Sequence, residues 1–147
     1  MEKIDPVKEA QVWQRVQAQQ TDVREGLQEM IAREWELAGA CLQLSRRLTG
    51  KQSMLLRQLY EKEQGHVACL KGIYTLITGQ RPNVRGFTAA VGFPEAELRR
   101  CYGKQMQNLA EYERRSNQGE YGHIFGNLAR QEREHCHLLL EILGSLK

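Results

Sequence analysis

A glutamate followed three residues later by a histidine occurs twice in equivalent surroundings, at Glu63 and His66 and again at Glu132 and His135. Both pairs lie inside long stretches whose apolar residues recur at spacings of three and four, the pattern of a helix with one buried face. Side chains three residues apart on an α-helix point the same way, so each pair presents a carboxylate and an imidazole together. Two such pairs facing each other make a two-metal site, and this arrangement requires long helices packed side by side.

Length and composition limit the architecture and the partners. With 147 residues, 41% hydrophobic residues and three prolines, the chain forms one domain, residues 1–147, that can bury its own core. Its net charge of +3 comes from 21 basic and 18 acidic residues without a basic block, so we expect no nucleic-acid partner. The first residues contain no apolar signal core, and every apolar run is far shorter than the roughly 20 residues that span a bilayer. We therefore expect a cytoplasmic protein with no membrane partner.

Four cysteines, Cys41, Cys69, Cys101 and Cys136, stand singly inside helical patterns, without a Cys-x-x-Cys. This spacing favours neither a disulfide framework nor a thiolate-bound zinc or iron. We interpret them as small core residues, and a redox role for one or more of them stays open.

The chain is predicted to be all-α, because no alternating strand pattern occurs. A short helix near residues 6–18, with Val7, Ala10, Trp13 and Val16 or Val12 on one side, is expected to cap the bundle as part of the N-terminal lead-in, residues 1–20. The bundle itself, residues 21–144, is expected to contain four long helices. They run from Asp22 to about Gly50, from Ser53 to Gly79, from Pro94 to about Asn117 and from about Glu120 to Leu143.

Local signals set these boundaries. Asp22 with Glu25 resembles a capping pair, and Gly50 supplies a stop. Ser53 is a candidate N-cap, Gly79 a candidate C-cap, and Pro94 a candidate first-turn residue. The stretch between Gly79 and Pro94 is too irregular for a helix and predicts a long crossover. Short, long and short connections indicate an antiparallel four-helix bundle with one crossover between the second and third helices.

Residues expected to face the core follow the three-and-four spacing of each helix. They are Leu27, Met30, Ile31, Leu37, Ala38, Cys41 and Leu44; Leu56, Leu59, Tyr60, Val67, Leu70, Ile73, Tyr74 and Ile77; Leu98, Cys101, Leu109 and Tyr112; and Phe125, Leu128, Ala129, Leu139 and Ile142.

The two halves of the chain also look duplicated. An offset of 69 (132 − 63) superposes Glu63 on Glu132 and brings the flanking leucines and histidines into register. A similar offset of 71 (105 − 34) places Glu34 on Gln105. Each half is then a helix with one polar inward residue, followed by a helix with Glu-x-x-His.

This arrangement resembles the ferritin-like di-iron and di-manganese carboxylate proteins, in which a Glu from the first helix of each half joins a Glu-x-x-His from the second. Residues 31–38 and the two Glu-x-x-His segments are most similar to rubrerythrin, and the resemblance covers about residues 21–144. It implies a ligand set in which His66 and His135 each bind one metal and three carboxylates complete the site, namely Glu34, Glu63 and Glu132.

The chain departs from this family at several positions. Gln105 occupies the position where the family usually has a Glu in the second half. Asn108, one helical turn later, occupies a position where rubrerythrins often have a further Glu. Cys41 replaces a tyrosine that the family often keeps, although Tyr112 is present in the other half. The 147 residues contain no Cys-x-x-Cys, so we expect no Cys-rich rubredoxin domain. Three carboxylates leave two divalent ions with a net positive charge, so we expect weaker binding at the metal nearer Gln105.

Two further Glu-x-x-His pairs provide a contrast, since all four histidines of the chain follow a glutamate by three residues. At about 100° per residue, His123 and His137 with their glutamates point away from the face that carries His135. We expect both pairs to lie on the surface.

The resemblance implies iron, with manganese as an alternative, and a redox role such as reduction of peroxide or dioxygen or oxidation of ferrous ion. Gln105 would be a weak ligand or a hydrogen-bond donor to bound peroxide. Tyr112, Tyr60 and Cys41 are candidates for orienting the ligands or for donating electrons, or they are simple core residues. Without an iron–thiolate domain, a peroxidase cycle needs a separate electron donor.

Three classes of function stay open at this point. The chain is a small ferritin-like oxidoreductase, a metal-handling protein with little turnover, or a metal-poor or metal-free bundle that serves as an interaction module because Gln105 replaces a ligand. In the metal-free case the histidines are protonated and the carboxylates pair with them. A homodimer through an outer helix face is also a prediction, with Trp13 and Trp35 as partly exposed anchors.

Overall fold

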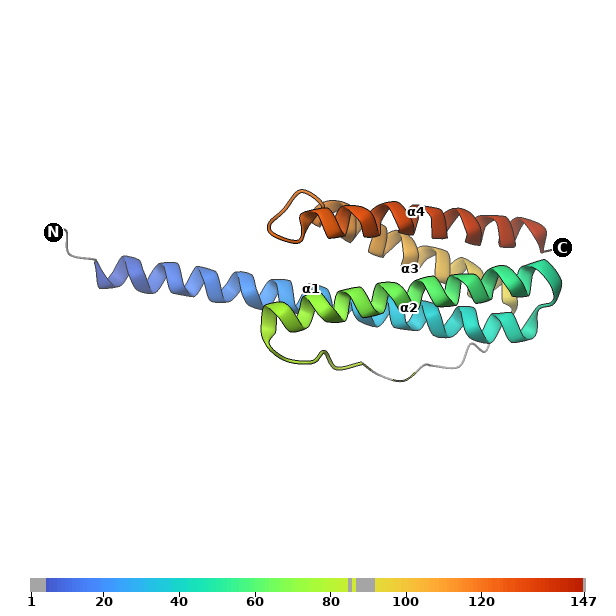
Figure 1. Cartoon of the computed structure of the whole chain (residues 1–147), viewed down its shortest axis with the longest axis horizontal. Coiled ribbons are helices and arrows are strands. Elements are labelled where there is room, and N and C mark those ends of the chain that lie inside the picture. Colours follow the sequence, from blue (N-terminus) through green and yellow to red (C-terminus); the bar gives the residue numbers. More distant parts are fainter. Residues whose placement is uncertain (1–4, 85, 87–91, 147) are drawn as a thin grey trace.

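A computed structural model describes residues 5–84, 86 and 92–146, and of residues 17–22 it describes only the helical backbone. Within these residues all secondary structure is α-helical, which confirms the predicted class. The helices are α1 (Pro6–Arg47), α2 (Gly50–Thr78), α3 (Pro94–Arg115) and α4 (Gly122–Ser145), as drawn in Figure 1.

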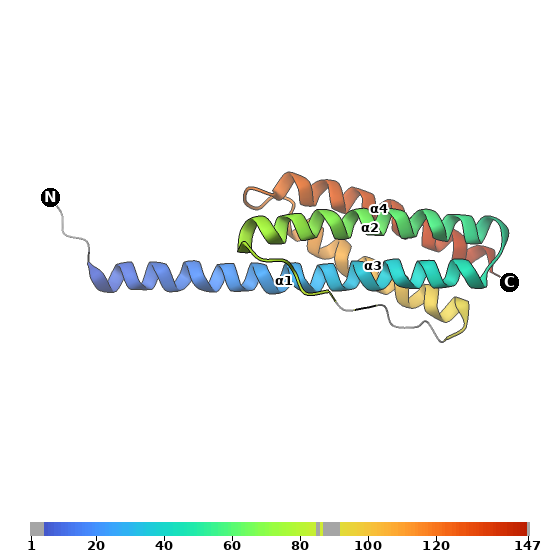
Figure 2. The ribbon, with the colours of Figure 1, turned by 60° about the horizontal axis from the view of Figure 1, so that its bottom comes forward.

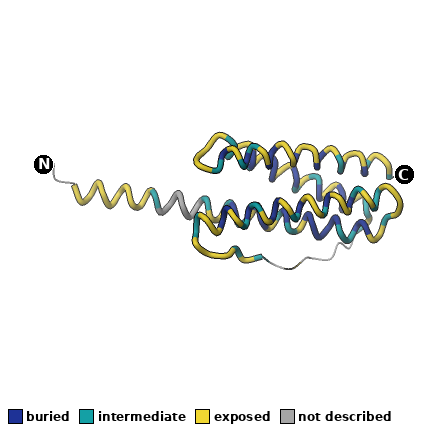
Figure 3. Tube along the Cα trace, viewed as in Figure 1, coloured by how far each residue is buried: buried dark blue, intermediate teal, exposed yellow. Residues whose placement is uncertain are grey.

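The four helices lie side by side along one long axis (Figures 1 and 2). The pairs α1 with α2 and α3 with α4 pack most extensively, and α1 also contacts α3 while α2 contacts α4. In both views α1 and α4 run in one direction and α2 and α3 in the other. The buried residues lie on the faces that the helices turn toward one another (Figure 3).

The core consists of three layers stacked along the axis. One apolar layer is formed by residues such as Leu27, Leu70 and Phe125, and the other by residues such as Leu44, Leu56 and Leu139. Between them, each helix contributes buried polar side chains. The order of residues along every helix is the same, apolar, polar and apolar, so the polar layer is closed at both ends by hydrocarbon.

The first helix differs from the prediction. α1 is continuous from Pro6 to Arg47, and its N-terminus is capped by Asp5, whose side chain accepts a hydrogen bond from the Val7 N–H at 3.0 Å. The predicted short helix at residues 6–18 and the predicted start at Asp22 are therefore wrong. The cause is local: residues 16–25 contain no Pro or Gly, and a single Asp or Thr costs only a few tenths of a kcal/mol inside a helix.

The N-terminal part of α1 extends beyond the other helices instead of capping them (Figures 1 and 2). Three of its apolar side chains are exposed, Val7, Val12 and Trp13. Trp35, by contrast, is half-buried against the apolar layer, with the Lys71 ammonium 5.3 Å from its ring centroid.

Other helix boundaries follow the predictions in part. Gly50 begins α2 with a φ of 60° instead of ending α1, so Thr49 is the N-cap residue. Ser53 is not a cap, because its hydroxyl donates to the Ser45 carbonyl at 2.6 Å. Gly79 ends α2 in the left-handed conformation, and Pro94 begins α3, both as predicted.

The connection from α2 to α3 contains no helix or strand at residues 79–84, 86, 92 and 93, while residues 85 and 87–91 of the predicted crossover lie outside the described residues. It is held against α1 at both ends. The Gln28 side-chain amide donates to the Asn83 carbonyl, and the Arg47 guanidinium donates to the Gly92 carbonyl at 2.7 Å.

The predicted core is confirmed for all positions except Tyr60 and Ile77, which are half-buried. Cys41, Cys101 and Cys136 are buried, as expected of small core residues, and Cys69 is half-buried. Among the described residues, none of the helices is long and apolar enough to cross a membrane.

Candidate metal centre

The polar layer contains the six side chains that the sequence singled out as ligands, with Asn108 added to them. Glu34, Glu63, Gln105, Asn108 and Glu132 have no exposed surface, and the exposed fractions of His66 and His135 are 4% and 2%. Helix periodicity explains this burial, because each ligand lies three, four or seven residues from leucines, valine or cysteine of the same face. Burying three carboxyl groups in one layer is costly unless protons or cations compensate for their charge.

His66 contacts carboxylates with one ring nitrogen and an amide with the other. Its Nδ1 lies 3.2 Å from Glu132 Oε2 and 3.4 Å from Glu34 Oε2. Its Nε2 lies 2.9 Å from Gln131 Oε1, and because an amide oxygen only accepts, Nε2–H is the donor. Burial disfavours the charged ring, but the contacts with the carboxyl groups of Glu132 and Glu34 prevail and raise the pKa of His66 to about 10.

His135 contacts the carboxylate of the opposite pair. Its Nδ1 lies 2.8 Å from Glu63 Oε1 and 3.7 Å from Glu132 Oε1. The two imidazoles are stacked, with ring centroids 4.8 Å apart. Burial, followed by the positive charge of His66, lowers the pKa of His135 to about 4. One imidazole of the pair is therefore charged at neutral pH and the other is neutral.

The three carboxyl groups also differ from one another. Burial, reinforced by the negative charge of Glu34, raises the pKa of both Glu63 and Glu132 well above the usual range. Burial acts on Glu34 in the same direction, but contacts with the Glu63 carboxyl and with His66 keep its pKa below the usual range. The cluster thus favours Glu34 as the carboxylate that faces the charged His66, while burial shifts Glu63 and Glu132 toward their protonated forms.

Gln105 and Asn108 act as hydrogen-bond donors at the positions where the family resemblance expects carboxylates. Gln105 Nε2 donates to Glu63 Oε1 at 2.8 Å, and Asn108 Nδ2 donates to Glu34 Oε1 at 2.6 Å. Arg33 Nε in turn donates to Asn108 Oδ1 at 2.6 Å, which fixes the orientation of that amide. Each amide therefore binds a carboxylate of the cluster through its nitrogen.

Four buried oxygens of this layer have no hydrogen-bond partner among the described residues: Glu34 Oε2, Glu63 Oε2, Glu132 Oε1 and Gln105 Oε1. Buried polar atoms without a partner are rare, because each loses its hydration without replacement, and here protons shared between the carboxyl groups or a bound cation can compensate. Oxygen atoms from carboxylates and an amide, next to two imidazoles, are also a donor set that iron and manganese bind. The residues therefore fit a metal centre.

The structure brings the predicted ligands together. Glu63, His66, Glu132 and His135 each offer one ligand atom, and these atoms lie within 4.8 Å of one another. Glu34 joins this group through His66, and Gln105 joins it through Glu63. Sequence reasoning missed Gln131 and Arg33, which orient His66 and Asn108. Neither has a pattern that marks it, because both lie outside the inward faces.

The three residues proposed to support the ligands occupy different surroundings. Tyr112 is buried, its ring centroid lies 6.2 Å from that of His66, and its hydroxyl has no hydrogen-bond partner among the described residues. Cys41 is buried, and burial, with the charges of Cys101 and Glu34, raises the pKa of its thiol. Tyr60 is half-buried, and its hydroxyl accepts a hydrogen bond from Gln64 at 2.7 Å, outside the polar layer.

The contrasting Glu-x-x-His pairs lie on the surface, as predicted. Glu120, His123, Glu134 and His137 are all exposed. The same short motif therefore occurs in both environments, and only the helix face distinguishes them.

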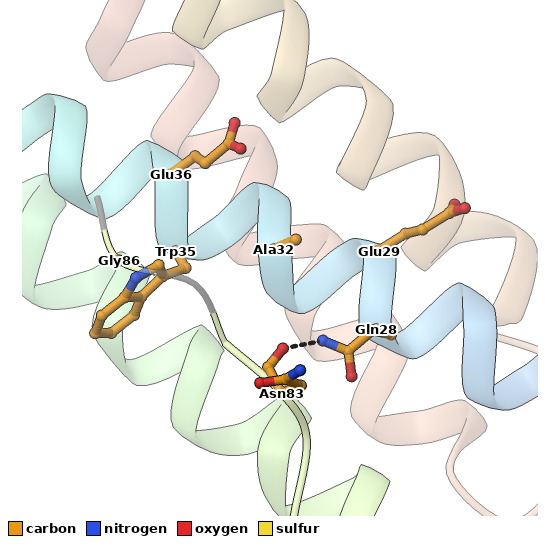
Figure 4. A pocket seen from close by; sticks show the side chains of 7 residues that line it. All are labelled: Gln28, Glu29, Ala32, Trp35, Glu36, Asn83 and Gly86. Carbon is orange, nitrogen blue, oxygen red and sulfur yellow. Dashed lines mark hydrogen bonds between the residues drawn. The ribbon is translucent and has the colours of Figure 1, made fainter. Parts of the chain in front are cut away.

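A separate hollow of about 390 Å³ lies between α1 and the segment that follows α2 (Figure 4). Two carboxylates, those of Glu29 and Glu36, line it without an imidazole or thiol, so it offers no comparable ligand set. Its lining consists of Gln28, Glu29, Ala32, Trp35, Glu36, Asn83 and Gly86.

Comparison of the chain with protein-family models, with curated proteins and with solved structures gives no match. The functional argument therefore depends on the chemistry of the polar layer.

Proposed function

We propose that this chain is a ferritin-like, rubrerythrin-like metal-binding protein whose polar layer holds two iron ions, or iron and manganese. The observation that carries the proposal is the convergence of three buried carboxyl groups and two buried imidazoles, four of which offer ligand atoms within 4.8 Å of one another. Glu34, Glu63 and Glu132 would supply the negative charge, and His66 and His135 would each bind one ion.

The helix arrangement supports the ferritin-like part of the proposal. The end of α2 and the beginning of α3 lie at opposite ends of the bundle (Figures 1 and 2), which is the placement that the proposed crossover requires. A bundle with one such crossover is the arrangement of ferritin-like proteins.

The hydrogen bond from His66 Nε2–H to Gln131 determines which ring nitrogen binds. Since Nε2 keeps its proton, Nδ1 is the nitrogen that becomes free to bind a metal, and it already faces the carboxylates. Burial, with the nearby carboxyl groups, raises the pKa of Tyr112 well above the usual value, so its hydroxyl keeps its proton. This hydroxyl has no hydrogen-bond partner among the described residues, so it can donate a hydrogen bond to a molecule in the site.

When bound, two redox-active ions divide a two-electron reduction of peroxide or dioxygen between them, or are themselves oxidised as ferrous substrate. In this proposal peroxide or dioxygen is the substrate and a separate protein or small molecule supplies electrons. The buried thiols are held protonated and are therefore poor nucleophiles, so we assign them no step.

A second function, an interaction or metal-handling module without turnover, is favoured by one observation. Gln105 and Asn108 each donate a hydrogen bond to a carboxylate of the cluster, and a charged His66 balances Glu34. These bonds let the polar layer persist with protons in place of metal ions.

Metal content tests the proposal directly. We expect about two iron or manganese ions per chain in protein from iron- and manganese-supplemented cells, and none in the double variant His66→Ala/His135→Ala, which loses both nitrogen ligands. The matched control is His123→Ala/His137→Ala, because these histidines have the same motif on the surface. One ion per chain would mean that Gln105 has reduced the site to a single metal. No metal, with unchanged thermal stability in the first variant, would contradict the proposal and favour the interaction module.

Metal binding is expected to release protons and to become tighter as the pH rises from 6 to 9. His66, with a pKa raised to about 10, holds a proton that a cation must displace, and the raised pKa values of Glu63 and Glu132 favour protons on their carboxyl groups as well. A lower pH therefore favours the metal-free form. Calorimetric titration with Mn²⁺ in buffers of different ionisation enthalpy should give about one to three protons released per chain. Binding without proton release would contradict the protonation pattern described above.

A further inference from the structure

The face between α2 and α4 carries a groove that leads from solvent to the polar layer. It has a volume of about 520 Å³, and its lining includes His66 and His135 together with Lys62, Gly65, Cys69 and Gln131. Both imidazoles of the candidate metal centre therefore form part of its wall.

The hollow on the opposite face, between α1 and α3, is far smaller among the described residues. It has a volume of only about 20 Å³, and Lys104 and Glu36, which form an ion pair, both line it. The two apolar layers close the ends of the polar layer. Of these two hollows, the groove between α2 and α4 is the wider, and two members of the cluster, His66 and His135, form part of its wall.

The exposed fractions of the side chains in the cluster also indicate that the cluster is reached from the groove between α2 and α4. The carboxylates and amides have no exposed surface, whereas His66 and His135, stacked on each other, retain 4% and 2%. The imidazole pair thus separates the groove from the carboxylates behind it. Gln131, an exposed residue, holds the outer nitrogen of His66 through one hydrogen bond of 2.9 Å.

We propose that the groove between α2 and α4 is the route by which a divalent metal ion reaches the cluster, with the two imidazoles as its inner gate. Polar side chains at the groove, Asn127, Gln131 and Glu134, offer oxygen atoms to an ion that is losing its water. Breaking the part-buried hydrogen bond to Gln131 frees the His66 ring to turn, which is the small movement that the gate requires. This inference rests on the proposed function, because it assumes that the cluster binds metal.

Gly65 gives a way to fill the groove without disturbing the core. A side chain added there meets no atom within 4 Å at its Cβ, and the residue is exposed on α2. Gly72 is the matched control, since it is also exposed on α2 with free space at its Cβ but does not line the groove.

The experiment compares Co²⁺ uptake and its removal by a chelator, followed by visible absorption, in the native chain, Gly65→Trp and Gly72→Trp. An obstruction on the route raises the barrier in both directions, so Gly65→Trp should slow uptake and removal by about tenfold or more while the Kd stays within about threefold. Gly72→Trp should match the native chain. Equal rates in all three proteins would overturn the groove as the route and leave the proposed function intact.

Chemical modification of Cys69 provides a second test, in which the groove is blocked in the folded native chain. Cys69 is the half-buried cysteine of the groove, whereas Cys41, Cys101 and Cys136 are buried. A methanethiosulfonate reagent should attach at Cys69, slow Co²⁺ uptake about tenfold, and release the block on reduction. Cys69→Ala treated in the same way should keep the native rate, and a modified protein that takes up Co²⁺ at the native rate would overturn the proposal. If the native chain binds no Co²⁺ at all, the proposed function fails and this inference fails with it.

Discussion

Gln105→Glu is expected to destabilise the metal-free protein and to strengthen metal binding. The amide of Gln105 now donates to Glu63 Oε1 at 2.8 Å, and its own oxygen has no hydrogen-bond partner among the described residues. A carboxylate in its place removes the donor and adds a like charge at hydrogen-bond distance, so both groups cannot ionise together. We expect the free energy of unfolding at pH 8 to fall by about 1–3 kcal/mol.

The loss of stability in Gln105→Glu is expected to depend on pH, because it comes from the repulsion between two carboxylates. The pKa of Glu63 is already raised by burial and by Glu34, and a neighbouring carboxylate raises it further. A carboxyl group whose pKa is raised in the folded state destabilises the protein as the pH rises above its value in the unfolded chain. The difference between variant and native chain should therefore shrink toward pH 5 in denaturant titrations.

In the metal-bound protein the substitution is expected to be favourable instead of unfavourable, because four carboxylates neutralise two divalent ions and three do not. We expect the second Mn²⁺ to bind about tenfold or more tightly in Gln105→Glu than in the native chain, in calorimetric titrations. Gln107→Glu is the control, since it makes the same change of charge two residues away on the exposed side of α3. If Gln105→Glu takes up no more metal than this control, Gln105 does not lie beside a metal position.

The polar layer could be predicted from sequence because each of its members repeats the helix period. Glu34, Glu63 and Glu132 lie among apolar residues at spacings of three and four, and this spacing fixes the face on which each carboxylate lies. The same argument correctly placed His123 and His137 on the surface, although their local motif is identical. Periodicity, rather than the motif, carried the information.

Two features could not be read from the sequence for physical reasons. The start of the bundle helix at Asp22 was wrong because a capping sequence is also tolerated inside a helix when no Pro or Gly interrupts it. The role of Gln131 depends on the distance between α2 and α4, which a pattern along one helix does not determine. Whether Gln105 faces a metal position or a carboxylate likewise depends on how three helices are placed relative to one another, which no single helix pattern determines.

Leu139→Ala is expected to cost about 2–5 kcal/mol of unfolding free energy, because it removes a fully buried side chain from a packed apolar layer. For a chain of this length each kcal/mol lowers the Tm by about 2–4 °C, so thermal denaturation followed by circular dichroism resolves the effect. The adjacent substitution Leu140→Ala is the control. Leu140 is 47% exposed, and its truncation should change stability by no more than about 0.5 kcal/mol.

This pair of variants also tests the orientation of α4, on which the candidate metal centre depends. Leu139 lies one turn beyond His135 on the same face, whereas Leu140 is rotated by about 100°. A rotation of α4 that turned Leu140 inward would turn His135 away from Glu63 and bring the exposed His137 closer to the core. A larger loss of stability in Leu140→Ala than in Leu139→Ala would therefore contradict both the packing of α4 and the place of His135 among the ligands.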